Sequence, residues 1–269
     1  MTQEQRPSTA TDDLGSCRTA IHCRATSGEA TLAKSSLIEY LGTIHHDRWA
    51  LLRRLLTWSA NTVLLPLQRR KARQRAATQP IRLHLGCGPL HKHGWINIDL
   101  AQPSPAAFRA WVARKRSGGK EELDLMWDLR RGLPFPDDSV EAIFAEHLLE
   151  HFDYAAGLAL LVECRRVLQP GSTLRIGVPD LERYIHAYHG RDPIIDDCRP
   201  GRPTRAIALS EIFFHHGHRA TYDYETLALA CREAGFSLLE HSAFAQGRLG
   251  AKVDSESRRP ETLYVEATK

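Results

Sequence analysis

The sequence lacks the features of a membrane-spanning or secreted protein. No apolar run reaches the roughly 18 residues that a membrane-spanning helix needs. Residues Met1 to Gly15 are polar and acidic, without the basic and then apolar segments of a secretory signal peptide. Hydrophobic residues make up 42% and charged residues 25% of the chain, which is typical of globular domains. We therefore expect a cytoplasmic protein.

The chain also lacks paired cysteines and a large excess of charge. Its six cysteines include no CxxC pair and no Cys/His cluster with zinc-site spacing, so we interpret them as reduced thiols. A net charge of +4 is too small to indicate nucleic-acid binding by itself. One short stretch is nevertheless strongly basic, and it contains Arg69, Arg70, Lys71, Arg73 and Arg75.

The residue pattern divides the chain into three parts. Residues 1–35 are rich in Thr, Ser, Gln and Ala, which predicts a disordered or loosely structured N-terminus. Residues 36–79 contain apolar side chains at helical spacing, which predicts an amphipathic helical extension followed by a basic linker. From residue 80 to residue 269, strand and helix patterns alternate, which predicts an α/β domain.

Seven strands and three helices are predicted in this domain. The strands are Ile81–Leu85, Ile96–Asp99, Leu123–Asp128, Glu141–Glu146, Thr173–Val178, Ser237–Phe244 and Thr262–Ala267. The helices are Ala106–Arg116, Tyr154–Leu168 and Tyr224–Ala234. A long polar excursion joins the last two strands, which favours an antiparallel pair that closes an otherwise parallel sheet.

A glycine turn follows the first predicted strand. Gly86 and Gly88 flank Cys87, and glycine lets the backbone turn sharply and approach a ligand closely. Asp99 ends the next strand, where a carboxylate can accept hydrogen bonds from both ribose hydroxyls of a nucleoside. There are two alternatives: the glycines form only the turn that ends the strand, and Asp99 only caps a helix or a turn.

The connection between these two strands is short. Only the seven residues from Pro89 to Trp95 separate Gly88 from Ile96, whereas a parallel crossover normally contains a helix. Four polar residues also alternate with apolar ones in the predicted strands, namely Arg82, His84, Asn97 and Arg175. We interpret these as one thinly covered sheet face, and we expect the upstream helix within Ser36–Leu67 to dock there.

Later motifs complete a recognisable series. They are Asp128-Leu129, the segment Leu133 to Ser139, the run Glu146-His147-Leu148-Leu149-Glu150-His151, and Arg166 to Gly171 followed by Val178-Pro179-Asp180. In this order, over roughly residues 81–236, the chain resembles the Methyltransf_11-like group of class I S-adenosylmethionine-dependent methyltransferases. The resemblance implies a Rossmann-like seven-stranded sheet with an antiparallel last strand.

The resemblance also implies S-adenosylmethionine as cofactor and assigns residues to it. Gly86, Cys87 and Gly88 would approach the methionine part, and Asp99 would bind the ribose. Asp128 and Leu129 would lie by the adenine. Glu146 and His147 would line the mouth where the methyl group is transferred.

Histidines supply the candidate catalytic residues. His147 and His151 share a face if their segment is helical, and Glu150 lies beside them; such a set either acts on the acceptor or caps the following helix. A second group, His215-His216-Gly217-His218, comes before Tyr222, and His218 or Tyr222 either reaches the acceptor pocket or ends a solvated helix. No third ligand has recognisable spacing, so no metal site is predicted.

These observations predict an S-adenosylmethionine-dependent methyltransferase (EC 2.1.1.-) that methylates the hydroxyl of a small molecule or a sugar-like acceptor. A cofactor-binding pseudoenzyme or regulatory module is one alternative. A nucleic-acid methyltransferase using Arg69–Arg75 is another, but the fourth strand is followed by no Asn-Pro-Pro-Tyr-like tetrapeptide, so we expect no nucleic-acid partner. The N-terminal helix could instead make weak contact with a membrane surface. The oligomeric state is left open.

Overall fold

The computed structural model describes residues 65–77, 81–100, 124–214 and 217–269. The chain divides into two compact units, residues 1–51 and 52–269, and every described residue belongs to the second. The predicted loose N-terminus, most of the predicted helical extension and the predicted helix Ala106–Arg116 lie outside the described residues.

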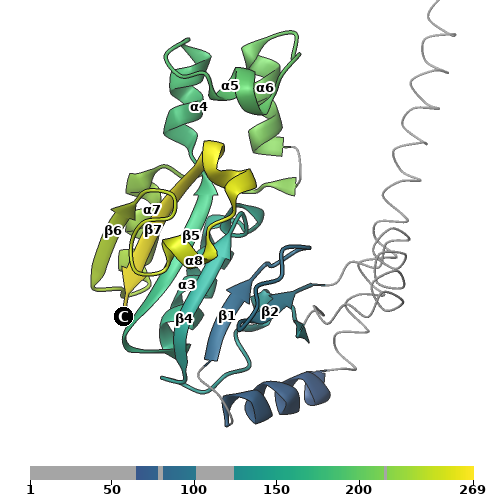
Figure 1. The fold of residues 1–269 in the computed structure, drawn as a ribbon, viewed down its shortest axis with the longest axis vertical. Helices are drawn as coiled ribbons and strands as arrows, with labels where there is room; N and C mark the ends of the chain where they lie inside the picture. The colour runs from purple at the N-terminus through teal and green to yellow at the C-terminus, as the bar shows by residue number, and fades with distance from the viewer. Residues whose placement is uncertain (1–64, 78–80, 101–123, 215–216) are drawn as a thin grey trace, which may run out of the picture. The chain divides into compact units, whose positions relative to one another are not determined.

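The described residues form a seven-stranded sheet with the order β3-β2-β1-β4-β5-β7-β6 (Figure 1). Strands β1 to β5 run parallel, and β7 is antiparallel to both β5 and β6, which confirms the predicted fold class. The strand bounds are β1 Ile81–Leu85, β2 Ile96–Asp99, β3 Leu125–Met126, β4 Val140–Glu146, β5 Leu168–Pro179, β6 Leu238–Ser242 and β7 Thr262–Thr268. The strand order reverses between the adjacent strands β1 and β4, and ligands bind at such a point in sheets of this type.

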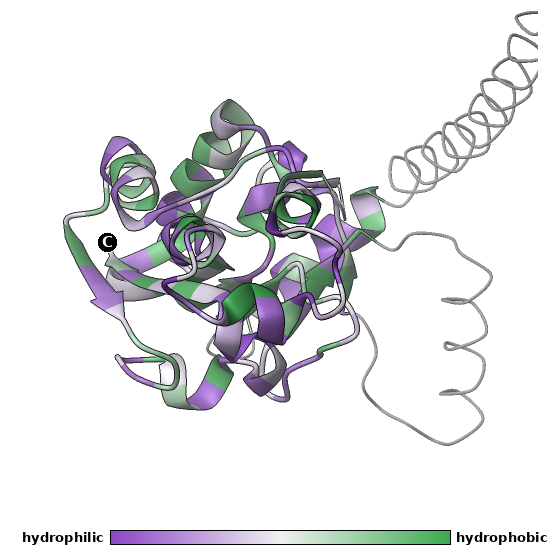
Figure 2. Ribbon diagram, turned by 90° about the horizontal axis from the view of Figure 1, so that it is seen from above, coloured by the Kyte–Doolittle hydropathy of each residue, from purple (hydrophilic) through white to green (hydrophobic). Residues whose placement is uncertain are grey.

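Two helices cover one face of the sheet. In α3 (Tyr154–Val167) the carboxylate of Asp153 accepts a hydrogen bond from the backbone of Ala156 at 2.9 Å, which fixes the start of the helix. Helix α7 (Tyr224–Glu233) is capped in the same way by Asp223. The ribbon helices in Figure 2 carry both hydrophobic and hydrophilic residues. The buried residues Leu160, Leu161, Leu227 and Cys231 of α3 and α7 belong to the main apolar core.

The opposite face, predicted to be thinly covered, is buried instead. His84, Asn97 and Arg175 are 3%, 5% and 0% exposed, so that prediction is wrong for these three residues, whereas Arg82 is exposed. The turns between β1 and β2 cover Asn97, whose side-chain oxygen accepts a hydrogen bond from the Lys92 amide at 2.8 Å. No helix lies in those turns, as predicted from their length.

The long excursion between β6 and β7 covers the rest of that face. It contains α8 (Gly250–Val253) and the 3-10 helix η4 (Glu256–Glu261). Arg175 donates to Asp254 at 2.6 Å and to Glu266 at 3.1 Å, and all three side chains are essentially inaccessible. A polar face is therefore buried because its charges are neutralised by the excursion and by β7.

Part of the segment predicted as a basic linker is helical. Residues 65–76 form a helix in which Ala72 is fully buried, and Leu65 and Ala76 pack on the main core. Lys71 donates to the Asp124 carbonyl, and Arg75 forms an ion pair with the Asp124 carboxylate at 2.9 Å. Among the described residues, no helix is both long and apolar enough to cross a membrane.

Three short helices between β5 and α7 were not predicted. They are α4 (Leu181–Tyr188), α5 (Ile194–Cys198) and α6 (Arg205–Phe214), and they lie together beyond the carboxyl end of β5 (Figure 1). They share a small apolar core of their own, formed by Tyr184, Ala187, Ile194, Ile195, Ala208 and Ile212. We refer to these three helices as the cap.

Candidate functional site

The glycine turn after β1 has the geometry of a ligand-binding turn. Gly86 and Gly88 have φ values of 63° and 49°, in the left-handed region that favours glycine. A Cβ at Gly86 would lie 2.6 Å from Leu148, whose side chain therefore packs on the turn from the end of β4. A Cβ at Gly88 would meet nothing within 4 Å, so the space beside this residue is open.

Asp99 lies directly against this turn. Its carboxylate oxygens accept from the backbone amides of Gly88 and Leu100, each at 2.6 Å. Burial raises the pKa of Asp99, and these hydrogen bonds oppose the rise. Cys87 is buried between the glycines, and burial raises the pKa of its thiol to about 12, which keeps it neutral. The structure thus brings together Gly86, Cys87, Gly88 and Asp99, as the sequence predicted.

Asp128 and Leu129 are placed beside this group by backbone contacts. The Trp127 amide donates to the Asp99 carbonyl at 3.0 Å. Asp128 caps the 3-10 helix η1 (Leu129–Arg131). Burial acts to raise the pKa of Asp128, but the hydrogen bonds from Arg130 outweigh it and lower this pKa. Leu129 is buried in the main core. Their assignment to the adenine stays a prediction.

Glu146 is held by other parts of the chain. Its carboxylate accepts from the Tyr264 hydroxyl at 2.8 Å and from the Ser255 amide at 3.1 Å. Burial, followed by the charge of Glu146, raises the pKa of Tyr264. Glu146 therefore ties the end of β4 to β7 and to the excursion, and its contact with a cofactor stays a prediction.

His147 adopts a backbone conformation unusual for its type. Its φ is 51°, and its amide donates to the Gly177 carbonyl at 2.8 Å. The ring Nε2 lies 2.8 Å from the Thr262 hydroxyl, and Nδ1 lies 3.5 Å from Glu150. Burial, together with the charge of Arg258, lowers the pKa of His147 to about 3, so the ring is neutral near pH 7.

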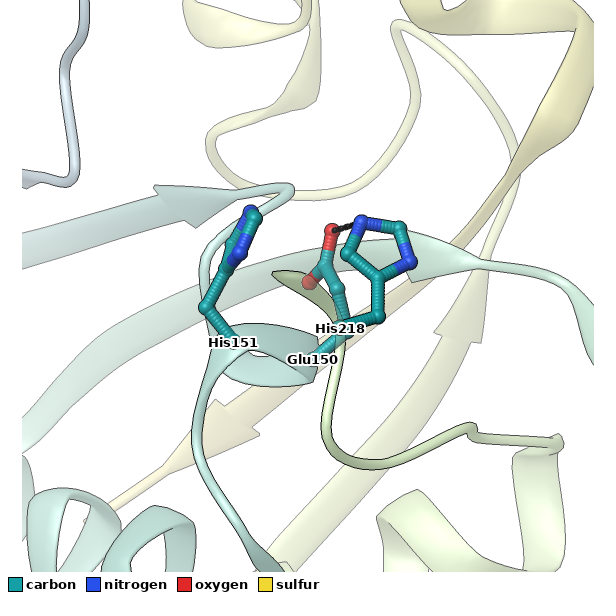
Figure 3. A group of neighbouring side chains, drawn as sticks. All are labelled: Glu150, His151 and His218. Atoms are coloured by element: carbon teal, nitrogen blue, oxygen red, sulfur yellow. Dashed lines mark ion pairs between the residues drawn. The ribbon is translucent and has the colours of Figure 1, made fainter. Parts of the chain in front are cut away.

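Glu150, His151 and His218 form a cluster just beyond Leu148 (Figure 3). Glu150 and His151 belong to the 3-10 helix η2 (Leu149–His151), and His218 follows the cap. One potential ligand atom from each of the three side chains lies within 4.8 Å of the other two. Glu150 is 1% exposed, and among the described residues neither of its carboxylate oxygens has a hydrogen-bond partner. Burial raises its pKa to about 8.

Backbone contacts hold this cluster in place. The carbonyl of Glu150 accepts from the amides of Arg219 and Ala220, at 2.7 and 3.2 Å. His218 Nδ1 donates to the Ile212 carbonyl at 2.6 Å, and His218 Nε2 lies 4.0 Å from Glu150. Burial lowers the pKa of His218, although the bond to Ile212 opposes this. The rings of His151 and His218 meet edge to face at 4.9 Å.

Tyr222, the other residue predicted near the acceptor, lies in the main core instead. It is 1% exposed, and burial raises the pKa of its hydroxyl to about 12. Sequence reasoning identified the segments of Glu150 and His218 separately but did not pair them. Glu150 and His218 meet because the chain that follows the cap passes beside η2. The spacing of residues in the sequence does not indicate this tertiary contact.

Residues 83–176 match the protein family described as methyltransferase domain. The fold is similar to that of a SAM-dependent methyltransferase from Archaeoglobus fulgidus, with 19% identity and a TM-score of 0.44 over 76% of this chain and 94% of that one. A Thermotoga maritima SAM-dependent methyltransferase, described as a possible histamine N-methyltransferase, has 17% identity and a TM-score of 0.41 over 84% and 96%. PigF with SAH has 15% identity and a TM-score of 0.44 over 72% and 51%.

No curated protein sequence matches the chain.

Proposed function

We propose that the protein is an S-adenosylmethionine-dependent methyltransferase that methylates a hydroxyl group of a small-molecule or sugar-like acceptor, in keeping with the match of residues 83–176 to the methyltransferase domain family. The cofactor is S-adenosylmethionine, for which Gly86, Gly88 and Asp99 provide the open turn and the ribose acceptor. In the reaction, the acceptor oxygen forms a bond to the methyl carbon as the carbon–sulfur bond breaks. The electron pair of that bond stays on sulfur, which gives S-adenosylhomocysteine, and the hydroxyl proton is released.

One observation carries this proposal. Leu148 packs on Gly86, and Glu150 and His151 lie two and three residues further along the chain, so polar groups lie close to the turn that would hold the methyl donor. A neutral amine can attack a sulfonium methyl group unaided, whereas a hydroxyl must be deprotonated or polarised. A built polar cluster at this position therefore favours a hydroxyl acceptor.

Release of S-adenosylhomocysteine tests the proposal. The purified protein is incubated with S-adenosylmethionine and with separate pools of hydroxylated small molecules, amines and nucleic acids. We expect turnover with a hydroxylated pool, and we expect His218→Asn to lower kcat with little change in cofactor affinity. Turnover with amines or nucleic acids alone would reject the proposed acceptor class. Cofactor binding without turnover on any pool would favour the pseudoenzyme.

A further inference from the structure

The cluster at the end of β4 has the composition and closeness of a metal site. We propose that Glu150, His151 and His218 bind one divalent transition-metal ion of the Zn²⁺ type and leave an open coordination position for the acceptor oxygen. Two histidines and one carboxylate are a common donor set for catalytic zinc and for other open first-row metal sites. The metal site stands on these side chains alone, while its use on an acceptor rests on the proposed function.

Glu150 provides the first argument. The side chain is 1% exposed, and within the part of the chain that the structure describes neither carboxylate oxygen has a hydrogen-bond partner; His147 Nδ1 and His218 Nε2 lie 3.5 and 4.0 Å away. Burying a carboxyl group without partners is costly, and nearly all buried polar atoms in folded proteins are hydrogen-bonded or bind an ion. A bound cation would give both oxygens the partner that no described residue supplies.

His218 provides the second argument. Its Nδ1–H is held by the Ile212 carbonyl at 2.6 Å, so the hydrogen is on Nδ1 and the lone pair is on Nε2. Nε2 is the nitrogen on the Glu150 side, 4.0 Å from the carboxylate. Metal-binding histidines usually donate their second ring nitrogen to such an acceptor, which orients the ring for the ion. The cap thus supplies the orienting contact.

The proposed ligand atoms are slightly too far apart for a metal site, so small side-chain movements would have to accompany metal binding. Ligand atoms in a tetrahedral zinc site lie roughly 3.3 Å apart, as follows from bond lengths of about 2.0–2.2 Å. Here the atoms lie within 4.8 Å of one another. His151 is the exposed member of the cluster, the backbone of Glu150 is bonded to residues 219 and 220, and His218 Nδ1 is bonded to the Ile212 carbonyl.

The ion would take over the task of activating the acceptor. A hydroxyl bound to a divalent metal has a lowered pKa and loses its proton to solvent water more readily, as metal-bound water does. The oxygen then attacks the methyl carbon, and the sulfonium sulfur leaves with the electron pair. His147 borders the cluster without belonging to the three proposed ligands: its Nδ1 lies 3.5 Å from Glu150, and its Nε2 lies 2.8 Å from the Thr262 hydroxyl.

A cobalt titration tests the site. The full chain, without an affinity tag and freed of metals by a chelator, is titrated with Co²⁺ and followed by its visible absorption and by calorimetry. We expect one equivalent to bind with the absorption of a low-coordinate nitrogen and oxygen site. Glu150→Gln and His151→Ala should each weaken binding by about a hundredfold or more, since even the loss of an outer-shell partner costs roughly 10–100-fold. His186→Ala, which removes an exposed histidine of α4, should leave it unchanged.

His151 is exposed, so His151→Ala tests the ligand role even if the buried Glu150→Gln variant unfolds. The absence of stoichiometric Co²⁺ binding would overturn the metal proposal, and so would equal binding by the wild type and His151→Ala. S-adenosylmethionine is titrated into the same samples. Cofactor binding without Co²⁺ binding rejects the metal site alone, whereas Co²⁺ binding without cofactor binding rejects the proposed function and keeps the site.

Discussion

At the scale of single residues, the open space beside Gly88 allows two roles of this glycine to be tested separately. One is its left-handed backbone conformation, and the other is ligand binding. Gly88 and Gly171 both have positive φ, and a Cβ at either would meet nothing within 4 Å. An alanine at either position should therefore cost a similar free energy of unfolding, about 1–2 kcal/mol for the left-handed conformation. Only Gly88→Ala should also weaken S-adenosylmethionine binding, since only Gly88 borders the predicted site.

Urea unfolding and calorimetric titration of both variants check this expectation. Gly171 lies at the start of β5 and bonds to Lys269, away from the proposed site. Unchanged cofactor affinity in Gly88→Ala would mean that the open space beside Gly88 is not where the cofactor binds.

The structure brings Gly86, Gly88 and Asp99 together, as the sequence predicted, while their binding of the cofactor stays a prediction. Gly86 and Gly88 follow β1 and Asp99 ends β2, and the carboxyl ends of neighbouring parallel strands meet at one edge of a sheet. Glu150 and His218 could not be paired in this way, because they meet only through the fold of the cap. The lack of partners for Glu150 is likewise a property of packing, which no sequence pattern encodes.

At the scale of secondary-structure elements, the excursion between β6 and β7 is held by a buried charge. Arg175 neutralises Asp254 and Glu266, and each of these side chains is at most 2% exposed. Arg175→Met would leave two buried carboxylates together without their counter-ion, which should lower the free energy of unfolding by about 3–5 kcal/mol.

An exposed pair offers the matched control for this substitution. Arg259 and Glu256 form an ion pair at 3.1 Å with side chains 60% and 73% exposed, so Arg259→Met should have little effect. Urea unfolding compares the two variants. Equal stability of Arg175→Met and the wild type would show that the buried ion pairs do not hold the excursion.

This network also explains why the sheet face was mispredicted. Alternating polar residues in a strand usually mean a solvated face, and Arg175, His84 and Asn97 follow that pattern. Asn97 is bonded by Lys92 of the β1–β2 turns, and Arg175 is bonded by Asp254 of the excursion. The periodicity of a strand does not show that partners elsewhere in the chain will bury its polar residues. The strands themselves were predictable, because β1 and β2 carry clear alternation and end at turn residues.

The helix over residues 65–76 makes a second element-scale prediction. Ala72 is fully buried against the core, whereas Ala77, at the end of the same segment, is exposed. Ala72→Glu would bury an unpaired charge and should lower the free energy of unfolding by more than about 2 kcal/mol, while Ala77→Glu should change it little. Thermal unfolding measures both, and equal melting temperatures would show that this helix does not pack on the core in solution.

At the scale of the whole molecule, the order of motifs predicted the architecture well. The antiparallel end of the sheet and the absence of a helix between β1 and β2 were both expected from the sequence. The cap was not expected, because α4, α5 and α6 are short and bury only a few side chains each. Such helices are stabilised by packing on one another more than by local propensity.

The central claim is that the turn after β1 and the acid after β2 bind the S-adenosyl group, and calorimetric titration of S-adenosylmethionine tests it most directly. We predict saturable binding at one site in the wild type and a loss of affinity of roughly tenfold or more in Asp99→Ala, since a hydrogen bond to a charged group is worth about 1.5–3 kcal/mol. Asp196→Ala, which removes an exposed carboxylate in α5, should bind like the wild type. Binding of NADH in place of S-adenosylmethionine, or unchanged affinity in Asp99→Ala, would contradict the account.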